Sequence, residues 1–152
     1  MPRKKSRKNR VPDHELLIFE IKAWEPSYVF AISGDHDRPE EYSEFAELRL
    51  DGACVYPDPY VGRTLKITAS SRRELSERPK RWPRPEERAD NIGLLELWPS
   101  RGSFYVGIPH DSLPFILTGL AAGQFRYVML AGPSLKRGHS LTREMYFTRT
   151  PD

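Results

Sequence analysis

Alternation of apolar and polar residues with a period of two is the feature that most constrains how this chain can fold. It is clearest in residues 64–70, where three apolar residues alternate with polar ones. Successive side chains of a β-strand point to opposite faces of its sheet, so this pattern predicts a strand with one buried face. Residues 46–50 and 141–147 repeat the pattern, with Arg143 as the exception in the second segment.

Five further segments are rich in aromatic and branched residues and also predict strands. Turn signals separate the predicted strands, among them Glu25-Pro26 and Asp51-Gly52. Residues 99–102 join two of the strands closely enough to predict a hairpin. The five segments are residues 16–24, 28–33, 92–98, 104–108 and 125–131.

One segment has the pattern of a helix instead. Asp111 or Ser112 is suited to cap its start, and Pro114 suits a first turn. An apolar stripe follows, and Gly123 is placed to end the helix in the left-handed conformation. We therefore predict one short helix near residues 112–122, which plugs one end of the sheet or lies across a seam.

These patterns predict a mainly β, single-domain fold: an antiparallel β-sandwich or barrel of about eight short strands with one short α-helix. The length of 152 residues suits one domain. We expect a flexible basic arm at residues 1–12 and a domain at 13–152 with a long charged loop at 71–91. Cys54 is the only cysteine, which excludes an intramolecular disulfide and favours a reducing compartment. No apolar segment suits a signal peptide or a membrane span, so we expect a soluble, cytoplasmic protein.

The positive charge of the chain is concentrated at its beginning. Six of the first ten residues are cationic, and without them the remaining chain has 18 Lys and Arg against 21 Asp and Glu. Residues 11–51 carry eleven acids and three bases, whereas residues 52–152 carry fifteen bases and ten acids. The basic arm is therefore predicted either to bind a polyanion or to lie against its own acidic segment.

Three basic clusters form the predicted contact surface for nucleic acid or for an acidic protein partner: the N-terminal arm, the charged loop at 71–91, and the segment around Lys136 and Arg137. Basic arms attract phosphate without sequence preference, and Trp82 between two arginines could stack on an unpaired base. Four glutamates within the loop oppose this interpretation, and a solvated charged loop is the alternative. The predicted contact residues are Arg3, Lys4, Lys5, Arg7, Lys8, Arg10, Arg81, Trp82, Arg84, Lys136 and Arg137.

A second functional hypothesis comes from Glu20-Ile21-Lys22 with Pro12-Asp13 upstream, which resembles the Pro-Asp…Glu-x-Lys signature of metal-dependent nucleases. The resemblance covers about a dozen residues. It implies a phosphodiesterase in which Asp13 and Glu20 hold Mg²⁺ and Lys22 stabilises the attacking hydroxide or the transition state. The alternative is an outward-facing ion pair between Glu20 and Lys22 on a strand.

Other catalytic and cofactor motifs are absent from the sequence. Neither the zinc motifs Cys-x-x-Cys and His-Glu-x-x-His nor a Gly-x-Ser-x-Gly elbow occurs, and phosphate-cradling glycine motifs are missing. Asp35-His36-Asp37 could contribute to a metal site only by convergence in space. We therefore predict no cofactor and no metal, and a non-enzymatic binding or accessory module, with the phosphodiesterase as the alternative.

Overall fold

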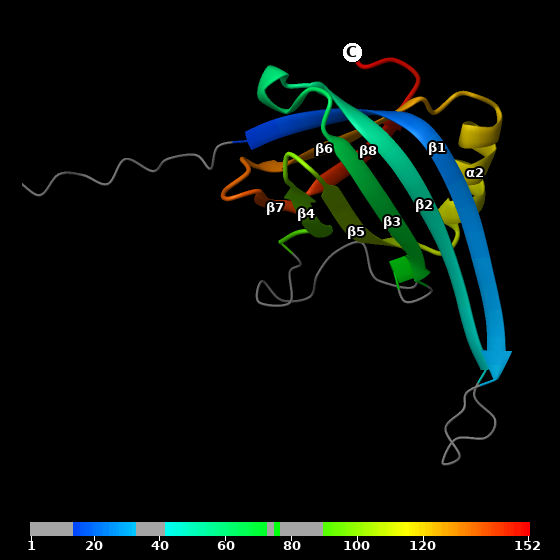
Figure 1. Cartoon of the computed structure of the whole chain (residues 1–152). Helices are drawn as coiled ribbons and strands as arrows, with labels where there is room; N and C mark the ends of the chain where they lie inside the picture. Colours follow the sequence, from blue (N-terminus) through cyan, green and yellow to red (C-terminus); the bar gives the residue numbers. More distant parts are fainter. Residues whose placement is uncertain (1–13, 33–41, 73–74, 77–89) are drawn as a thin grey trace, which may run out of the picture.

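The computed structural model describes residues 14–32, 42–72, 75–76 and 90–152. The strands in this part form one eight-stranded sheet in the order β7-β4-β5-β3-β2-β1-β6-β8 (Figure 1). Neighbouring strands are antiparallel except β3 and β5, which run parallel. The elements are β1 (His14–Ile32), β2 (Tyr42–Tyr56), the 3-10 turn η1 (Asp58–Tyr60), β3 (Thr64–Arg72), β4 (Gly93–Leu97), β5 (Gly102–Pro109), the helix α2 (Ser112–Ala121), β6 (Tyr127–Pro133), β7 (His139–Thr142) and β8 (Glu144–Thr148).

The sheet curls until its two ends nearly meet, which makes it a barrel. The end strands β7 and β8 are consecutive in the chain, and Arg143 lies between them. The Arg143 amide donates to the carbonyl of Ala131 in β6 at 2.8 Å, and Ser140 Oγ in β7 donates to the carbonyl of Pro133 at 2.5 Å. These bonds bring β7 beside β6, so the residue that broke the alternating pattern marks the change from one strand to the next.

The barrel interior is filled by the apolar residues that alternate along the strands. Phe19, Ile67 and Phe104 are completely buried there, together with leucines from β2, β3, β4 and β6. Polar neighbours of these residues point outward, as the burial pattern of β3 demonstrates. Burial of large aromatic and aliphatic side chains supplies most of the stabilising free energy of such a fold.

The helix α2 covers part of this core with one apolar stripe. Leu113, Ile116 and Leu120 are buried within the core cluster. Gly123 has φ +66°, the left-handed conformation predicted for the end of the helix. Asp111 occupies the N-cap position, but its carboxylate accepts a hydrogen bond from Ser76 Oγ at 2.9 Å and does not cap the helix.

The prediction of a mainly β barrel or sandwich with one short helix is confirmed, but two predicted turns are wrong. Residues 16–24 and 28–33 were expected as two strands, yet Glu25-Pro26 lies inside β1, which is 19 residues long. Pro26 pairs with Leu48 of β2 on one side and has no strand on its other side in the described chain. A proline, which lacks an N–H, is tolerated at such an edge.

The second wrong turn is Asp51-Gly52, which lies inside the 15-residue strand β2. Gly52 is buried, and a Cβ atom at this position would lie 3.2 Å from Cβ of Phe19. The missing side chain therefore lets β2 pack closely against the core face of β1. By contrast, the hairpin predicted at residues 99–102 is present, since the Trp98 amide donates to the carbonyl of Arg101 at 2.8 Å.

Candidate functional site

The two longest strands extend past the rest of the sheet as a two-stranded ribbon (Figure 1). Strand β6 pairs with β1 only from His14 to Glu20, and β3 pairs with β2 only from Glu47 to Ala53. The β1–β2 ladder continues from Trp24 opposite Leu50 to Ile32 opposite Tyr42. We call residues 24–32 and 42–50 the projecting ribbon; at its base residues 47–50 still pair with β3, and only the part beyond them is two-stranded. The segment 33–41 that joins its strands lies outside the described residues.

An irregularity in the ladder lies where the ribbon leaves the barrel. Ile21 is paired with Gly52 and Ala23 with Asp51, so Lys22 is an extra residue in β1. Such a β-bulge bends the strand and increases its local twist. The bulge follows directly after the last residue of β1 that pairs with β6, and it therefore directs the ribbon away from the neighbouring strands.

Large apolar side chains are exposed on both faces of the ribbon. Trp24 and Tyr28 lie on the face that continues the barrel interior, and they are 38% and 60% exposed. Val29 and Phe45 face each other across the ladder on the opposite face, and they are 50% and 40% exposed. A concentration of exposed apolar surface of this kind is typical of an interaction site.

Acidic side chains accompany these aromatic rings. Glu44 accepts a hydrogen bond from the Tyr28 hydroxyl at 3.1 Å, and Glu25 lies in register with Arg49. Arg49 Nε is bound to Glu47 at 2.7 Å, so the one cation of the ribbon is already neutralised. Neither Glu25 nor Glu44 takes part in an ion pair within the described chain. The ribbon therefore has aromatic rings and uncompensated carboxylates side by side.

The hydroxyl of Tyr28 is affected by this arrangement. Desolvation by the surrounding ribbon and the hydrogen bond to Glu44 raise the pKa of Tyr28 above its ordinary value of 10.0. A raised pKa keeps the phenol protonated and available as a hydrogen-bond donor. A phenol that donates to a carboxylate beside an open apolar face is suited to binding.

The residues of the nuclease hypothesis lie just before the ribbon. Lys22 Nζ lies 2.5 Å from Glu20 Oε2, and both side chains are partly exposed on the outside of the barrel. Among the described residues, no three His, Cys, Asp or Glu side chains are grouped closely enough to hold a metal ion. Asp13 lies outside the described residues, as does Asp35-His36-Asp37, so the two-carboxylate site itself stays a prediction.

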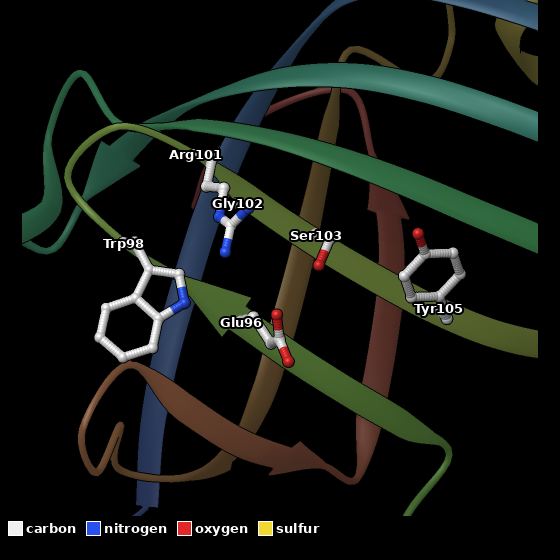
Figure 2. A pocket seen from close by; sticks show the side chains of 6 residues that line it. All are labelled: Glu96, Trp98, Arg101, Gly102, Ser103 and Tyr105. Carbon is white, nitrogen blue, oxygen red and sulfur yellow. The ribbon is translucent and has the colours of Figure 1, made fainter.

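A second feature is a shallow hollow of about 260 Å³ on the outer face of β4 and β5 (Figure 2). Glu96, Arg101 and Ser103 point into it, and Trp98 and Tyr105 stand at its two ends (Figure 2). Ser103 has no hydrogen-bonded histidine or carboxylate within the described chain, so nothing there activates it as a nucleophile. The hollow is a polar surface depression without the enclosed apolar walls of a typical small-molecule site.

Two of the predicted contact residues lie beside this hollow. Lys136 and Arg137 begin the tight turn between β6 and β7, where Arg137 and Gly138 have φ +52° and +78°. Positive φ at both central positions is the geometry of a two-residue hairpin. Gly138 contacts the indole of Trp98, so the turn packs against the β4–β5 hairpin and presents Lys136 and Arg137 to solvent.

The other predicted contact residues lie outside the described part of the chain. These include the whole basic arm as well as Arg81, Trp82 and Arg84 in the predicted loop. Lys136 and Arg137 lie at the end of the barrel where β1 begins, because His14 pairs with Pro133. His14, the first described residue, therefore lies near these two cations, at the end of β1 opposite to the projecting ribbon (Figure 1).

Comparisons with known proteins identify no relative. The chain matches no protein-family model, and no similar protein was found among curated proteins or solved structures. No helix of the described residues is long and apolar enough to cross a membrane. The function must therefore be argued from the geometry of the chain itself.

Sequence reasoning missed the ribbon, although a signal was present. Trp24 and Tyr28 were treated as ordinary strand residues and Phe45 lay outside the predicted strands, because aromatic content alone does not distinguish a buried face from an exposed one. The available signal was the acidic surroundings, since residues 11–51 carry a large excess of acids. Aromatic residues among like charges are unusual in a core and are more typical of an exposed contact surface.

Proposed function

We propose that this protein is a non-enzymatic binding module whose projecting ribbon receives a cationic segment of a partner protein. The observation that carries the proposal is the two-faced exposure of Trp24, Tyr28 and Phe45 beside Glu25 and Glu44. Apolar exposure supports a binding role, and the carboxylates indicate the charge of the partner. Arginine and lysine satisfy both, since they pair with carboxylates and also stack on aromatic rings.

The stability of the ribbon supports the same conclusion. An isolated two-stranded hairpin is only marginally stable in water and gains stability from a third strand or from a packed face. Beyond Glu20, β1 has no strand on its outer edge within the described chain. A partner segment that binds in extended conformation could pair with this edge and cover the aromatic side chains at the same time.

The proposal is tested with a fluorescently labelled peptide of repeated Gly-Arg-Lys units. We expect its anisotropy to rise on addition of the full-length protein and to rise less at high salt. A Gly-Glu-Asp peptide of the same length should not bind. The ribbon variant combines Glu25→Gln, Glu44→Gln and Tyr28→Ser, and it should lose about tenfold in affinity, as the loss of two exposed ion pairs and one aromatic contact implies.

A matched control variant makes the same three types of change outside the ribbon. It combines Asp58→Asn, Asp152→Asn and Tyr105→Ser, all at exposed positions. The control should bind the cationic peptide as the wild type does. If the ribbon variant and the control variant lose the same affinity for the cationic peptide, the effect is one of overall charge and the proposal is refuted. Equal affinity of the wild type and the ribbon variant would also refute the proposal.

The phosphodiesterase alternative has no further observation in its favour, and it is tested separately. The full-length protein is incubated with a supercoiled plasmid and with labelled single-stranded DNA in the presence of Mg²⁺ or Mn²⁺. We expect no cleavage. Metal-dependent cleavage that Glu20→Ala abolishes would establish the alternative and would contradict a purely binding role.

A further inference from the structure

We infer that the cationic segment bound by the projecting ribbon is the N-terminal arm of a second copy of this chain. The inference rests on the proposed function and specifies its partner. It connects the arm, which has six cations in its first ten residues, with the ribbon, which carries Glu25, Glu44 and Glu47 against Arg49. Each copy would then give its arm to one neighbour and receive the arm of another.

Charge complementarity is the first argument. Glu25 and Glu44 lie on the ribbon without an ion-pair partner in the described chain. The cations of the described ribbon and of the adjoining bulge, Arg49 and Lys22, are each bound to a neighbouring glutamate. A basic segment therefore meets carboxylates without competition from cations of the ribbon, whereas two ribbons brought together would repel each other.

The second argument is distance. The arm precedes His14, which pairs with Pro133 at the end of the barrel opposite to the ribbon. At about 3.3 Å per residue, β1 runs about 60 Å from His14 to Ile32. The thirteen residues before His14 span at most about 45 Å when fully extended. Along the path of the strand, the arm of the same copy thus ends before the distal half of the ribbon, whereas the arm of a second copy is not limited in this way.

The third argument concerns the form of the assembly. Arm and ribbon are different surfaces, so the contact is heterologous, and each bound pair leaves one arm and one ribbon available. Such contacts either close into rings or continue into open chains. A reciprocal exchange of arms closes at a dimer, and a non-reciprocal one continues into larger species. The wild type should therefore associate as its concentration increases, and high salt should dissociate it.

The test is sedimentation velocity of full-length proteins at low salt. The arm variant replaces all six arm cations: Arg3→Gln, Lys4→Gln, Lys5→Gln, Arg7→Gln, Lys8→Gln and Arg10→Gln. It keeps the ribbon, while the ribbon variant defined above keeps the arm. We expect the wild type and the control variant to associate and each of the two variants alone to remain monomeric. An equimolar mixture of the two variants should form dimers and nothing larger, because the only contact left is that between the arm of the ribbon variant and the ribbon of the arm variant.

Several results would overturn the inference. A wild type that remains monomeric over the whole concentration range, a mixture that remains monomeric, or a ribbon variant that associates like the wild type would each do so. If a variant fails to fold, a peptide of residues 1–13 is added in excess to the wild-type protein instead. The peptide should compete with the arm and dissociate the assembly, and an assembly that is unaffected by the peptide contradicts the inference. The cationic peptide experiment is independent, so binding of that peptide without self-association refutes the inference and leaves the proposed function intact.

Discussion

The substitution Gly93→Ala tests how tightly the barrel wall is packed between β4 and β5. A Cβ atom at position 93 would lie 2.2 Å from the carbonyl oxygen of Tyr105 and 2.8 Å from the ring of Phe104. Both distances are well inside van der Waals contact at about 3.5 Å. The oxygen belongs to the backbone of a paired strand and the ring is completely buried, so neither can move without disturbing the wall.

The expected loss in the free energy of unfolding follows from the groups that the added Cβ atom would displace. Separating the strands near Gly93 weakens about two ladder hydrogen bonds, each worth about 0.5–1.5 kcal/mol. Displacing the Phe104 ring adds about 1–3 kcal/mol for overpacking. The reduced entropy of the unfolded chain returns at most about 1 kcal/mol. We therefore expect Gly93→Ala to lower the free energy of unfolding by about 2–5 kcal/mol, a large part of the total for a typical domain.

The assay is urea unfolding followed by circular dichroism, with Gly107→Ala as the matched control. Gly107 lies on the adjacent strand β5, and its Cβ would meet side-chain atoms of Arg72 at 3.0 and 3.1 Å and a methyl group of Leu75 at 3.3 Å. A long side chain can shift, so this variant should change stability by less than about 1 kcal/mol. A difference of less than about 1 kcal/mol between the two variants would refute the reasoning, because the contacts with the Tyr105 backbone and the buried Phe104 ring distinguish them.

Three further predictions concern other parts of the molecule. Cys54 is 2% exposed and burial raises its thiol pKa above 9.0, so alkylation at pH 8 should be at least about a hundredfold slower in the folded than in the urea-unfolded protein. Because the thiol of the unfolded chain ionises at a lower pH than the buried thiol, the free energy of unfolding should be unaffected below pH 9 and should fall as the pH rises above it. The variant Cys54→Ala should lack this part of the pH dependence. Combined Tyr28→Ser and Val29→Ser should change the free energy of unfolding by less than about 1 kcal/mol, because both side chains are at least half exposed, and a larger loss in urea unfolding would show that they support the fold. Replacing the six arm cations by glutamine should reduce the dependence of duplex-DNA affinity on salt by up to about five units of the log–log slope, and an unchanged slope would contradict the predicted polyanion contact.

The extent to which the sequence predicts this fold depends on which physical signal each element carries. Residues 64–70 alternate strictly and form β3, because a strand with one buried face leaves a period-two pattern. Gly123 was assigned correctly, because only glycine commonly adopts the left-handed conformation that ends a helix. Local signals of this kind are independent of the rest of the chain and can therefore be predicted.

The two wrong turn predictions concern residues whose conformation depends on the neighbouring strands. Proline usually breaks a strand, but β6 pairs with β1 only up to Glu20, so Pro26 lies on an edge with no neighbouring strand among the described residues, and its missing N–H does no harm. Gly52 usually indicates a turn, but here it provides space for Phe19 of the adjacent strand. The candidate site depended on the same information, because which strand has no neighbour is a property of the sheet order and not of the residues in that strand.

The continuity of β1 has a mechanical consequence. One strand forms part of the barrel wall through its pairing with β6 from His14 to Glu20 and then continues into the projecting ribbon. A pull on the ribbon along its axis would load the ladders β1–β6 and β2–β3 lengthwise, so that many hydrogen bonds would share the force at once. The ribbon is thus anchored in shear, and a tethered partner could pull on it without peeling the strand from the barrel one bond at a time.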